Sequence, residues 1–420
     1  MSTSDTIHQE VGLRPDRSVP RSRVNSGDPG VDRRGRSRKA PPFLSYGFRP
    51  FFLLGAIYAA LAVPLWLWTY FGGQAPSGAF DPLAWHAHEM IFGYLGAVMA
   101  GFILTAVPNW TGRLPLSGGP LAALVGLWLA GRMAMFANPE PLSTAVLDLA
   151  FPVVLAAAVW REIVAGHNLG NAPVALLLSL FAAANLLDHA VGLAVGLQGY
   201  GIRLALAVAA LLMALVGGRV IPSFTRNWMA RTKRAPLPAP MDHLDRMAIG
   251  VTAIVLAGWV AAPDASSVAT GLLAAGLLLL ARLVRWRGHR TLAEPIVLVL
   301  HLGYLWLALA LLLMGLSGLA PSSVPVSSAF HALTAGAVGT MTLAVMTRAS
   351  RGHTGREIVA DGVTLAIYML VTFGALLRVL APFTADMYAP MLMLSGTAWS
   401  GAFALFAVSY GPMLVTKRAA

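Results

Sequence analysis

The chain has no cysteine among its 420 residues. This absence excludes structural disulfides, iron–sulfur clusters, thiolate-ligated or covalently attached haem, and metal sites built on thiolates. Any redox metal must therefore be held by histidine, methionine or carboxylate side chains. Charged residues are also scarce, at 11% of the chain, whereas 57% of the residues are hydrophobic. Such a composition is too apolar for an ordinary soluble domain, and we expect an integral membrane protein.

The apolar residues form twelve runs that are each long enough to cross a bilayer, which takes about 20 residues. We therefore predict an all-α polytopic membrane protein with spans at 50–71, 86–107, 120–137, 144–164, 171–192, 202–221, 246–262, 268–284, 295–317, 326–347, 359–380 and 388–415. Residues 1–48 are basic, rich in Ser, Pro and Gly, and without an apolar pattern. We expect them to form a disordered cytoplasmic tail that precedes a transmembrane domain over residues 49–420. They lack the apolar core of a secretory signal, so no cleavage is expected.

The positive charges support this topology. Of the 30 Lys and Arg residues, 27 lie in segments that the twelve spans place on one side of the membrane, and only Arg132, Arg203 and Arg378 remain. By the positive-inside rule, both termini are cytoplasmic and the loop at 72–85 is external. The net charge of +12 is thus explained by topology, and we expect the lipid bilayer as a partner but no nucleic acid.

Spans two, six and ten carry related patterns. His88 and His331 precede a Thr-Gly-Arg triplet by the same number of residues, at 111–113 and 354–356. Spans two and six also end on a common pattern, Val107-Pro-Asn-Trp-Thr111 and Ile221-Pro-Ser-Phe-Thr225. Because these spans are four apart, we interpret the chain as three four-helix pseudo-repeats.

The matched histidines indicate a cofactor. Each is followed by glycines five and eight residues later, which are Gly93 and Gly96 in one copy and Gly336 and Gly339 in the other. Glycine has no Cβ, so a porphyrin could lie against the backbone while the imidazole reaches its iron. We therefore predict that His88 and His331 are the axial ligands of a haem b, and that these four glycines face it.

The topology places four histidines at one depth, in the outer quarter of the bilayer: His86, His88, His189 and His331. His301 lies instead in the inner half of span nine, and we keep it as a further candidate for cofactor binding.

Helical geometry separates His86 from His88. Residues two apart on a helix point about 200° apart and cannot chelate one ion from the same face. We predict that His88 faces span ten and its haem, whereas His86 faces span five and binds copper with His189 and a carboxylate, Glu89 or Asp188. The alternative is a non-helical segment in which both histidines serve one site. The pattern is not the His-Glu-x-x-His of zinc proteases, which excludes that activity.

Other polar residues gather at the same outer level. Ionisable residues inside membrane spans usually mark a site or a water-filled cavity. Arg203 and Asp148 are the exceptions, because we interpret them as interface residues that snorkel toward water. The outer polar group comprises Glu89, Arg132, Asp148, Asn185, Arg203 and Arg378.

Several long motifs resemble the NnrS family. They are His86-Ala-His-Glu-Met-Ile-Phe-Gly-Tyr94, Ala106-Val-Pro-Asn-Trp-Thr-Gly-Arg113, Gly217-Gly-Arg-Val-Ile-Pro-Ser-Phe-Thr-Arg226, His301-Leu-Gly-Tyr304, His331-Ala-Leu-Thr334, Met341-Thr-Leu-Ala-Val-Met-Thr-Arg348 and Gly352-His-Thr-Gly-Arg356. The resemblance covers nearly everything after the tail. It implies a haem- and copper-containing protein of the bacterial inner membrane, linked to denitrification and to protection against nitric oxide, without fixing a reaction.

The threefold organisation also resembles the large subunit of haem–copper oxidases and nitric oxide reductases, in which the second and tenth helices carry the axial histidines of a low-spin haem. This chain departs from that pattern, because its seventh span has no histidine pair and its sixth span has no histidine. The three-histidine copper site is therefore absent, and oxygen-reductase chemistry is not expected.

We thus expect a membrane haem protein, with copper, that acts on nitric oxide or a related small ligand, with an unassigned electron donor. One alternative is a twelve-helix transporter that exports a metal, haem or a nitrosylated complex, which predicts a site near the bilayer midplane. Threefold repetition and an off-centre site argue against it. The other alternative is a haem sensor that signals through the tail, but the tail has no recognisable domain.

Overall fold

The computed structural model describes residues 40–190 and 199–419. Over these ranges all the regular secondary structure is helical, and there is no strand. Twelve helical segments are long and apolar enough to cross a membrane, which confirms the predicted all-α multi-pass architecture. Most of the predicted tail lies outside the described residues. Its last part, residues 40–47, includes a single 3₁₀ turn at Pro42–Leu44 (η1).

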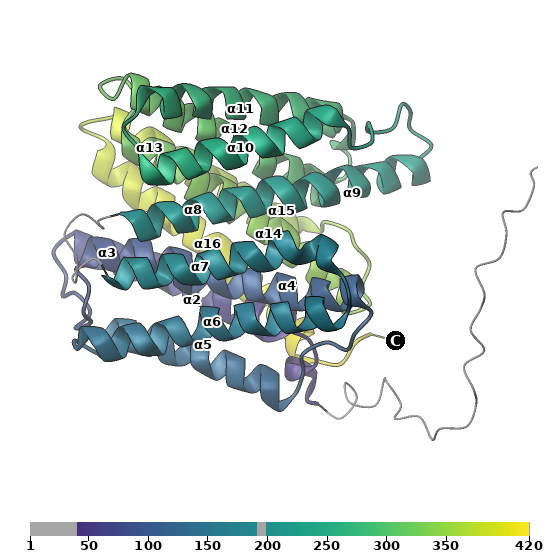
Figure 1. The fold of residues 1–420 in the computed structure, drawn as a ribbon, viewed down its shortest axis with the longest axis horizontal. Coiled ribbons are helices and arrows are strands. Elements are labelled where there is room, and N and C mark those ends of the chain that lie inside the picture. Colours follow the sequence, from purple (N-terminus) through teal and green to yellow (C-terminus); the bar gives the residue numbers. More distant parts are fainter. Residues whose placement is uncertain (1–39, 191–198, 420) are drawn as a thin grey trace, which may run out of the picture.

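Figure 1 shows the helices as one bundle whose axes lie roughly parallel or antiparallel to one another. The helices in chain order are α2 (Phe48–Tyr70), α3 (Pro82–His88), α4 (Gly96–Thr111), α5 (Gly119–Ala137), α6 (Pro141–Ala165), α7 (Ala172–His189), α8 (Tyr200–Leu212), α9 (Gly218–Arg231), α10 (His243–Ala261), α11 (Ser266–Arg285), α12 (Pro295–Leu319), α13 (Val326–His331), α14 (Gly339–His353), α15 (Gly362–Leu380) and α16 (Tyr388–Val415). Short 3₁₀ turns also occur at Leu169–Asn171 (η3), Gly288–Thr291 (η6) and Ala381–Phe383 (η8).

Three spans are interrupted by a π-helical segment. Span two contains Glu89–Leu95 (η2), span six contains Met213–Gly217 (η5) and span ten contains Ala332–Val338 (η7). These are the same three spans whose sequences are related. A π segment is rare and is often found at functional sites. The three thus share a backbone feature, while the organisation into three four-helix pseudo-repeats stays a prediction.

These interrupted spans also extend further than their apolar runs. Span six, for example, continues as α9 to Arg231 rather than ending at residue 221. Hydropathy marks where the apolar face ends, but the backbone hydrogen bonds continue through the polar residues that follow. Sequence pattern therefore located every span and underestimated the length of these three.

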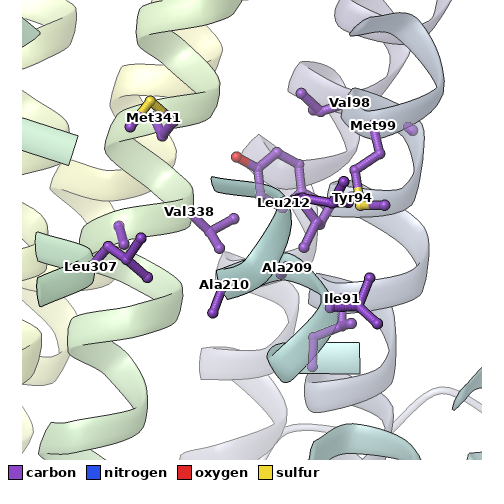
Figure 2. Packing of buried hydrophobic residues seen from close by; sticks show 14 of the residues in the cluster. Ile91, Tyr94, Val98, Met99, Ala209, Ala210, Leu212, Leu307, Val338 and Met341 are labelled. Carbon is purple, nitrogen blue, oxygen red and sulfur yellow. The ribbon is translucent and has the colours of Figure 1, made fainter. Parts of the chain in front are cut away.

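The interrupted spans lie at the centre of the bundle. The share of their apolar window that is buried is 83% for span two, 61% for span six and 72% for span ten; only α12 among the other spans exceeds half, at 67%. In Figure 1, α4, α8 and α14 pass between α5 and α6 on one side and α10 and α11 on the other. Figure 2 shows the core where they meet, with Val98, Leu212 and Val338 close together.

The bundle has two distinct ends. Figure 1 shows the C-terminus at the end where α2 begins, which we call the termini end, and α3 and α13 begin at the opposite end, which we call the α3 end. Consecutive spans pack side by side, and α16 packs on α2. The last span therefore closes the arrangement against the first.

A buried ion pair fixes the packing of α9, α10, α11 and α12. The guanidinium of Arg282 is fully buried, and its Nε donates to Asp245 at 2.6 Å. Its Nη1 donates to the carbonyl of Ala214 at 2.7 Å and to the hydroxyl of Tyr304 at 2.9 Å. A Cβ on Gly218 would overlap the guanidinium. Glycine at 218 is therefore required for the close approach of Arg282.

We predict that Gly218→Ala lowers the stability of the folded protein, because the added methyl must displace a buried guanidinium from its carboxylate. Breaking a buried pair of this kind typically costs about 3–5 kcal/mol. The matched control is Gly250→Ala on α10, where a Cβ would meet nothing within 4 Å. Thermal unfolding in detergent should show a clear drop for Gly218→Ala and none for Gly250→Ala; equal midpoints would contradict this account.

Candidate functional site

Two histidines project from one short helix at the α3 end. Pro82 occupies the first position of α3, and the Asp81 carboxylate caps the helix by accepting from the backbone N–H groups of Leu83 and Ala84 at 2.9 and 3.0 Å. The helix ends at His88, where the π segment η2 begins. His86 and His88 therefore lie on the last turn of a regular helix and point to different sides.

His88 lies in a buried polar cluster between α3, α6 and α7. Its Nε2 is 2.8 Å from Oδ2 of Asp148, and its Nδ1 is 2.8 Å from Oδ2 of Asp188. The Nε2 of His189 is 3.0 Å from the same Asp148 oxygen. Asn185 donates to it as well, at 2.6 Å. Asp148 therefore links two histidines and an amide from neighbouring helices, although it is only 1% exposed.

The cluster continues toward α5 and α2. The second Asp148 oxygen accepts from Arg132, which also pairs with the buried Glu89, and the Tyr58 hydroxyl donates to Glu89. Three carboxylates, including that of Asp188, thus face a single guanidinium. The cluster therefore carries excess negative charge, which a bound cation would compensate.

The donor atoms fit a metal ion. The Nε2 atoms of His88 and His189 and a carboxylate oxygen of Asp148 lie within 4.8 Å of one another. Two imidazoles and a carboxylate suit a divalent transition metal, and three protein ligands leave a coordination position open. Asp188 behind Nδ1 of His88 is the arrangement that orients an imidazole ligand and raises its basicity.

His86 and His331 line a separate cavity between α2, η2, η7 and α16. Its other walls are mainly apolar and aromatic, with Trp66 and Trp399 among them. The His86 ring stacks on Trp66 with centroids 4.2 Å apart. Nδ1 of His331 is 2.8 Å from the carbonyl of Ser327, to which it can donate. The other nitrogen of His331, Nε2, is then the one with a free electron pair.

These residues fit a haem. Nδ1 of His86 is buried without a hydrogen-bond partner among the described residues, as is one amino group of Arg378, which also lines the cavity. The other amino group of Arg378 donates to the hydroxyl of Ser327 at 3.0 Å. A porphyrin with two carboxylates would need imidazole ligands for its iron, apolar walls and a cation for a carboxylate. The cavity offers all three, because it has two imidazoles, apolar and aromatic walls and a guanidinium with one amino group unpaired among the described residues.

The structure groups the two span-two histidines differently from what we expected, while their roles as ligands stay predictions. His86 shares the cavity with His331, and His88 lies with His189, whereas the matched spacing predicted the opposite pairing. The prediction that the two face different sites holds, because α3 is helical. His88 and His331 both come directly before a π segment, so they occupy equivalent positions.

The four matched glycines do not line the His86 and His331 cavity. A Cβ on Gly336 would meet the ring of Trp306 at 2.7 Å, and one on Gly339 would meet Trp399 at 2.6 Å. A Cβ on Gly93 would likewise meet the side chains of Arg132 and Glu89 at 2.7 Å, whereas one on Gly96 would be in ordinary contact with aromatic rings. The glycines thus admit neighbouring side chains, not a porphyrin face.

His301 lies apart from both sites. It is 5% exposed, and its Nδ1 and Nε2 are 3.2 and 3.3 Å from the carbonyl of Val297 and the hydroxyl of Thr225. Both ring nitrogens of His301 therefore have hydrogen-bond partners within the protein.

The structure also differs from expectation at Asp148 and at Tyr58. Asp148 does not snorkel, because it is buried at the centre of the cluster. Arg203 is partly buried, donates to the carbonyl of Val260 at 3.3 Å and lies over the ring of Tyr200. Tyr58 was not foreseen as part of the site. A lone tyrosine in an apolar span gives no sequence signal, since its partner Glu89 comes from another helix.

We predict that Asp148→Asn destabilises the protein, because Arg132 loses a carboxylate and His88 and His189 lose their common acceptor. Removing one partner of a buried ion pair typically costs about 3–5 kcal/mol. The control is Asp264→Asn in an exposed loop. Thermal unfolding should separate the two variants, and a midpoint for Asp148→Asn like that of the wild type would show that the cluster does not stabilise the fold.

Comparison with known proteins agrees with the motifs. A family model described as NnrS protein matches residues 42–418, which is nearly the whole chain. Comparison with curated proteins gives no match. Since the family model covers far more than half of the sequence, the chain belongs to the NnrS family.

Proposed function

We propose that this protein binds a haem b between His86 and His331 and a copper ion at His88, Asp148 and His189. We further propose that it uses the two centres to handle nitric oxide in the bacterial inner membrane. Membership of the NnrS family supports metal or haem binding in general. The observation that carries the proposal is that one helix supplies imidazoles to two different donor sets, on opposite sides of α3.

The residues around the first site are suited to hold a haem. Nε2 of His331 is left available by the contact of Nδ1 with Ser327, and His86 is held in place by stacking on Trp66. Arg378 supplies a guanidinium for a propionate. A haem held by His86 and His331 would supply one-electron redox chemistry, and the apolar and aromatic walls would keep water away from it.

The second site is suited to a redox-active cation. Arg132 compensates only one of the three carboxylates Glu89, Asp148 and Asp188, so two negative charges in the cluster remain for the cation. His88 is oriented by Asp188, and His189 completes the set. The open coordination position is where a small ligand would bind. Nitric oxide is neutral and dissolves in lipid, so it needs no polar channel to reach a site inside the bundle.

The two sites lie close together along the chain. His86 and His88 are separated by about 3 Å along the axis of α3 at 1.5 Å per residue. Their opposite directions keep the two donor sets apart, while the helix backbone connects them. The groups that these residues would hold would therefore lie on opposite sides of one helix.

The orientation follows from charge. Of the 27 basic residues that the topology groups together, the 18 that the structure describes belong to the termini end, and we propose that this end faces the cytoplasm. Both sites then lie near the outer surface. A transporter with a site at the midplane is less well supported, because both donor sets lie toward the α3 end and the bundle between the two ends is apolar.

We predict that His86→Ala and His331→Ala each lower haem content or convert a six-coordinate low-spin spectrum to a five-coordinate one. His88→Ala should retain haem, as should the control His301→Ala. Absorption spectra of purified protein, oxidised and reduced, test this. Loss of haem in His88→Ala with normal haem in His86→Ala would restore the opposite assignment of the two histidines.

We predict the converse for the second centre. His88→Ala and His189→Ala should each lose bound copper and keep haem, because they remove imidazole ligands on the far side of α3. The control is His243→Ala, whose side chain is exposed. Metal analysis of folded protein, with the haem spectrum as an internal reference, gives the measurement. Unchanged copper in both variants would place the metal elsewhere.

A further inference from the structure

An apolar cavity of about 110 Å³ lies at the centre of the bundle, where spans two, six and ten meet. Figure 2 shows several of its lining residues: Val98, Met99, Ala209, Leu212, Val338 and Met341. Residues from four helical spans thus surround it, including parts of all three interrupted spans. Neither donor set of the proposed function lies in it.

The lining leaves water without partners. Its only side chain with a polar group is Thr342, and that hydroxyl already donates to the carbonyl of Val338 at 2.8 Å and contacts the Tyr94 hydroxyl. A buried water needs two to four polar partners, and a cavity without them stays dry. A dry cavity of roughly 150 Å³ in another protein binds xenon or benzene. The cavity here is therefore suited to small, neutral, apolar molecules.

The cavity adjoins two others. Leu95 and Val338, which are the last residues of η2 and η7, line both this cavity and the one that holds His86 and His331. On the other side, it shares Phe102, Val216 and Val345 with a cavity of about 430 Å³ near the termini end. The three cavities thus form a row along the bundle, with only side chains between them.

The cavity near the termini end is partly polar, whereas the central cavity is apolar. The cavity near the termini end is lined in part by exposed side chains, among them Asn109, Arg219 and His353. In the central cavity, by contrast, residues such as Ile103, Ala209 and Leu300 are at most 3% exposed. An ion entering the central cavity would lose its hydration without finding a polar partner.

From this arrangement we infer that the central cavity is a binding site for diatomic-sized neutral molecules. We also infer that the row is their internal route between the termini end and the His86 and His331 cavity. Leu95 and Val338 form the boundary that such a molecule crosses, by movement of side chains alone. The inference that the cavity binds such molecules depends only on its lining residues. That nitric oxide is the molecule it binds rests on the proposed function.

Xenon tests the binding site directly, because it is neutral, apolar and detectable in solution. Wild-type protein in lipid nanodiscs should show a saturable xenon NMR signal that empty nanodiscs lack. Ala209→Phe should abolish it by filling the cavity, since Ala209 lines the central cavity alone. Ala157→Phe on the exposed face of α6 should leave it unchanged.

Ala209→Leu adds less volume and should weaken the xenon signal while the protein stays folded by thermal unfolding, so the result is readable even where Ala209→Phe fails to fold. No saturable signal in the wild type, or a full signal in folded Ala209→Leu and Ala209→Phe, would overturn the proposal. Xenon binding requires no cofactor. A haem-binding failure in the His86 and His331 variants would therefore leave this result standing, and the converse also holds.

Discussion

The carboxylate of Asp148 determines how the α3 end of the bundle is built. It accepts from Arg132, His88, His189 and Asn185, which come from three different helices. In a bilayer no water is available to satisfy such groups, so each polar atom must find its partner within the protein. The cluster therefore holds α3, α5, α6 and α7 in one relative arrangement.

That arrangement has a consequence on the other side of α3. Once His88 is turned toward Asp148, helical geometry turns His86 away from it, by about 200° for residues two apart. His86 then faces α2 and α16, where Trp66 stacks on its ring and His331 lies in the same cavity. One buried carboxylate thus sets the direction of both imidazoles.

The charge of the cluster also bears on metal binding. Arg132 compensates only part of the negative charge of Glu89, Asp148 and Asp188. Uncompensated charge inside a membrane protein is costly, so the cluster favours a further cation beside these carboxylates. The imidazoles of His88 and His189 adjoin the same Asp148 oxygen and would share in binding such a cation.

Sequence pattern predicted the twelve spans because lipid demands long apolar helices, and it ranked histidines by depth for the same reason. It did not predict which of His86 and His88 faces span ten, because depth carries no information on rotation. Asp148 was misread for a related reason. A carboxylate near a span end has the same pattern whether it snorkels or pairs, and Arg132 and His88 are distant in sequence. The π segments likewise left no trace in hydropathy.

The distribution of polarity along the bundle bears on what the protein can move. Polar clusters lie toward the two ends, around Asp148 at one and Arg282 at the other, and the central cavity between them has apolar walls. A charged or metal-bound substrate crossing this region would be desolvated without compensation, at a cost of several kcal/mol. A neutral diatomic molecule meets no such barrier. The residues that make the bundle a poor pathway for ions are thus the same ones on which the proposed route for a small apolar ligand depends, and for this reason we prefer a fixed site to transport in the proposed function.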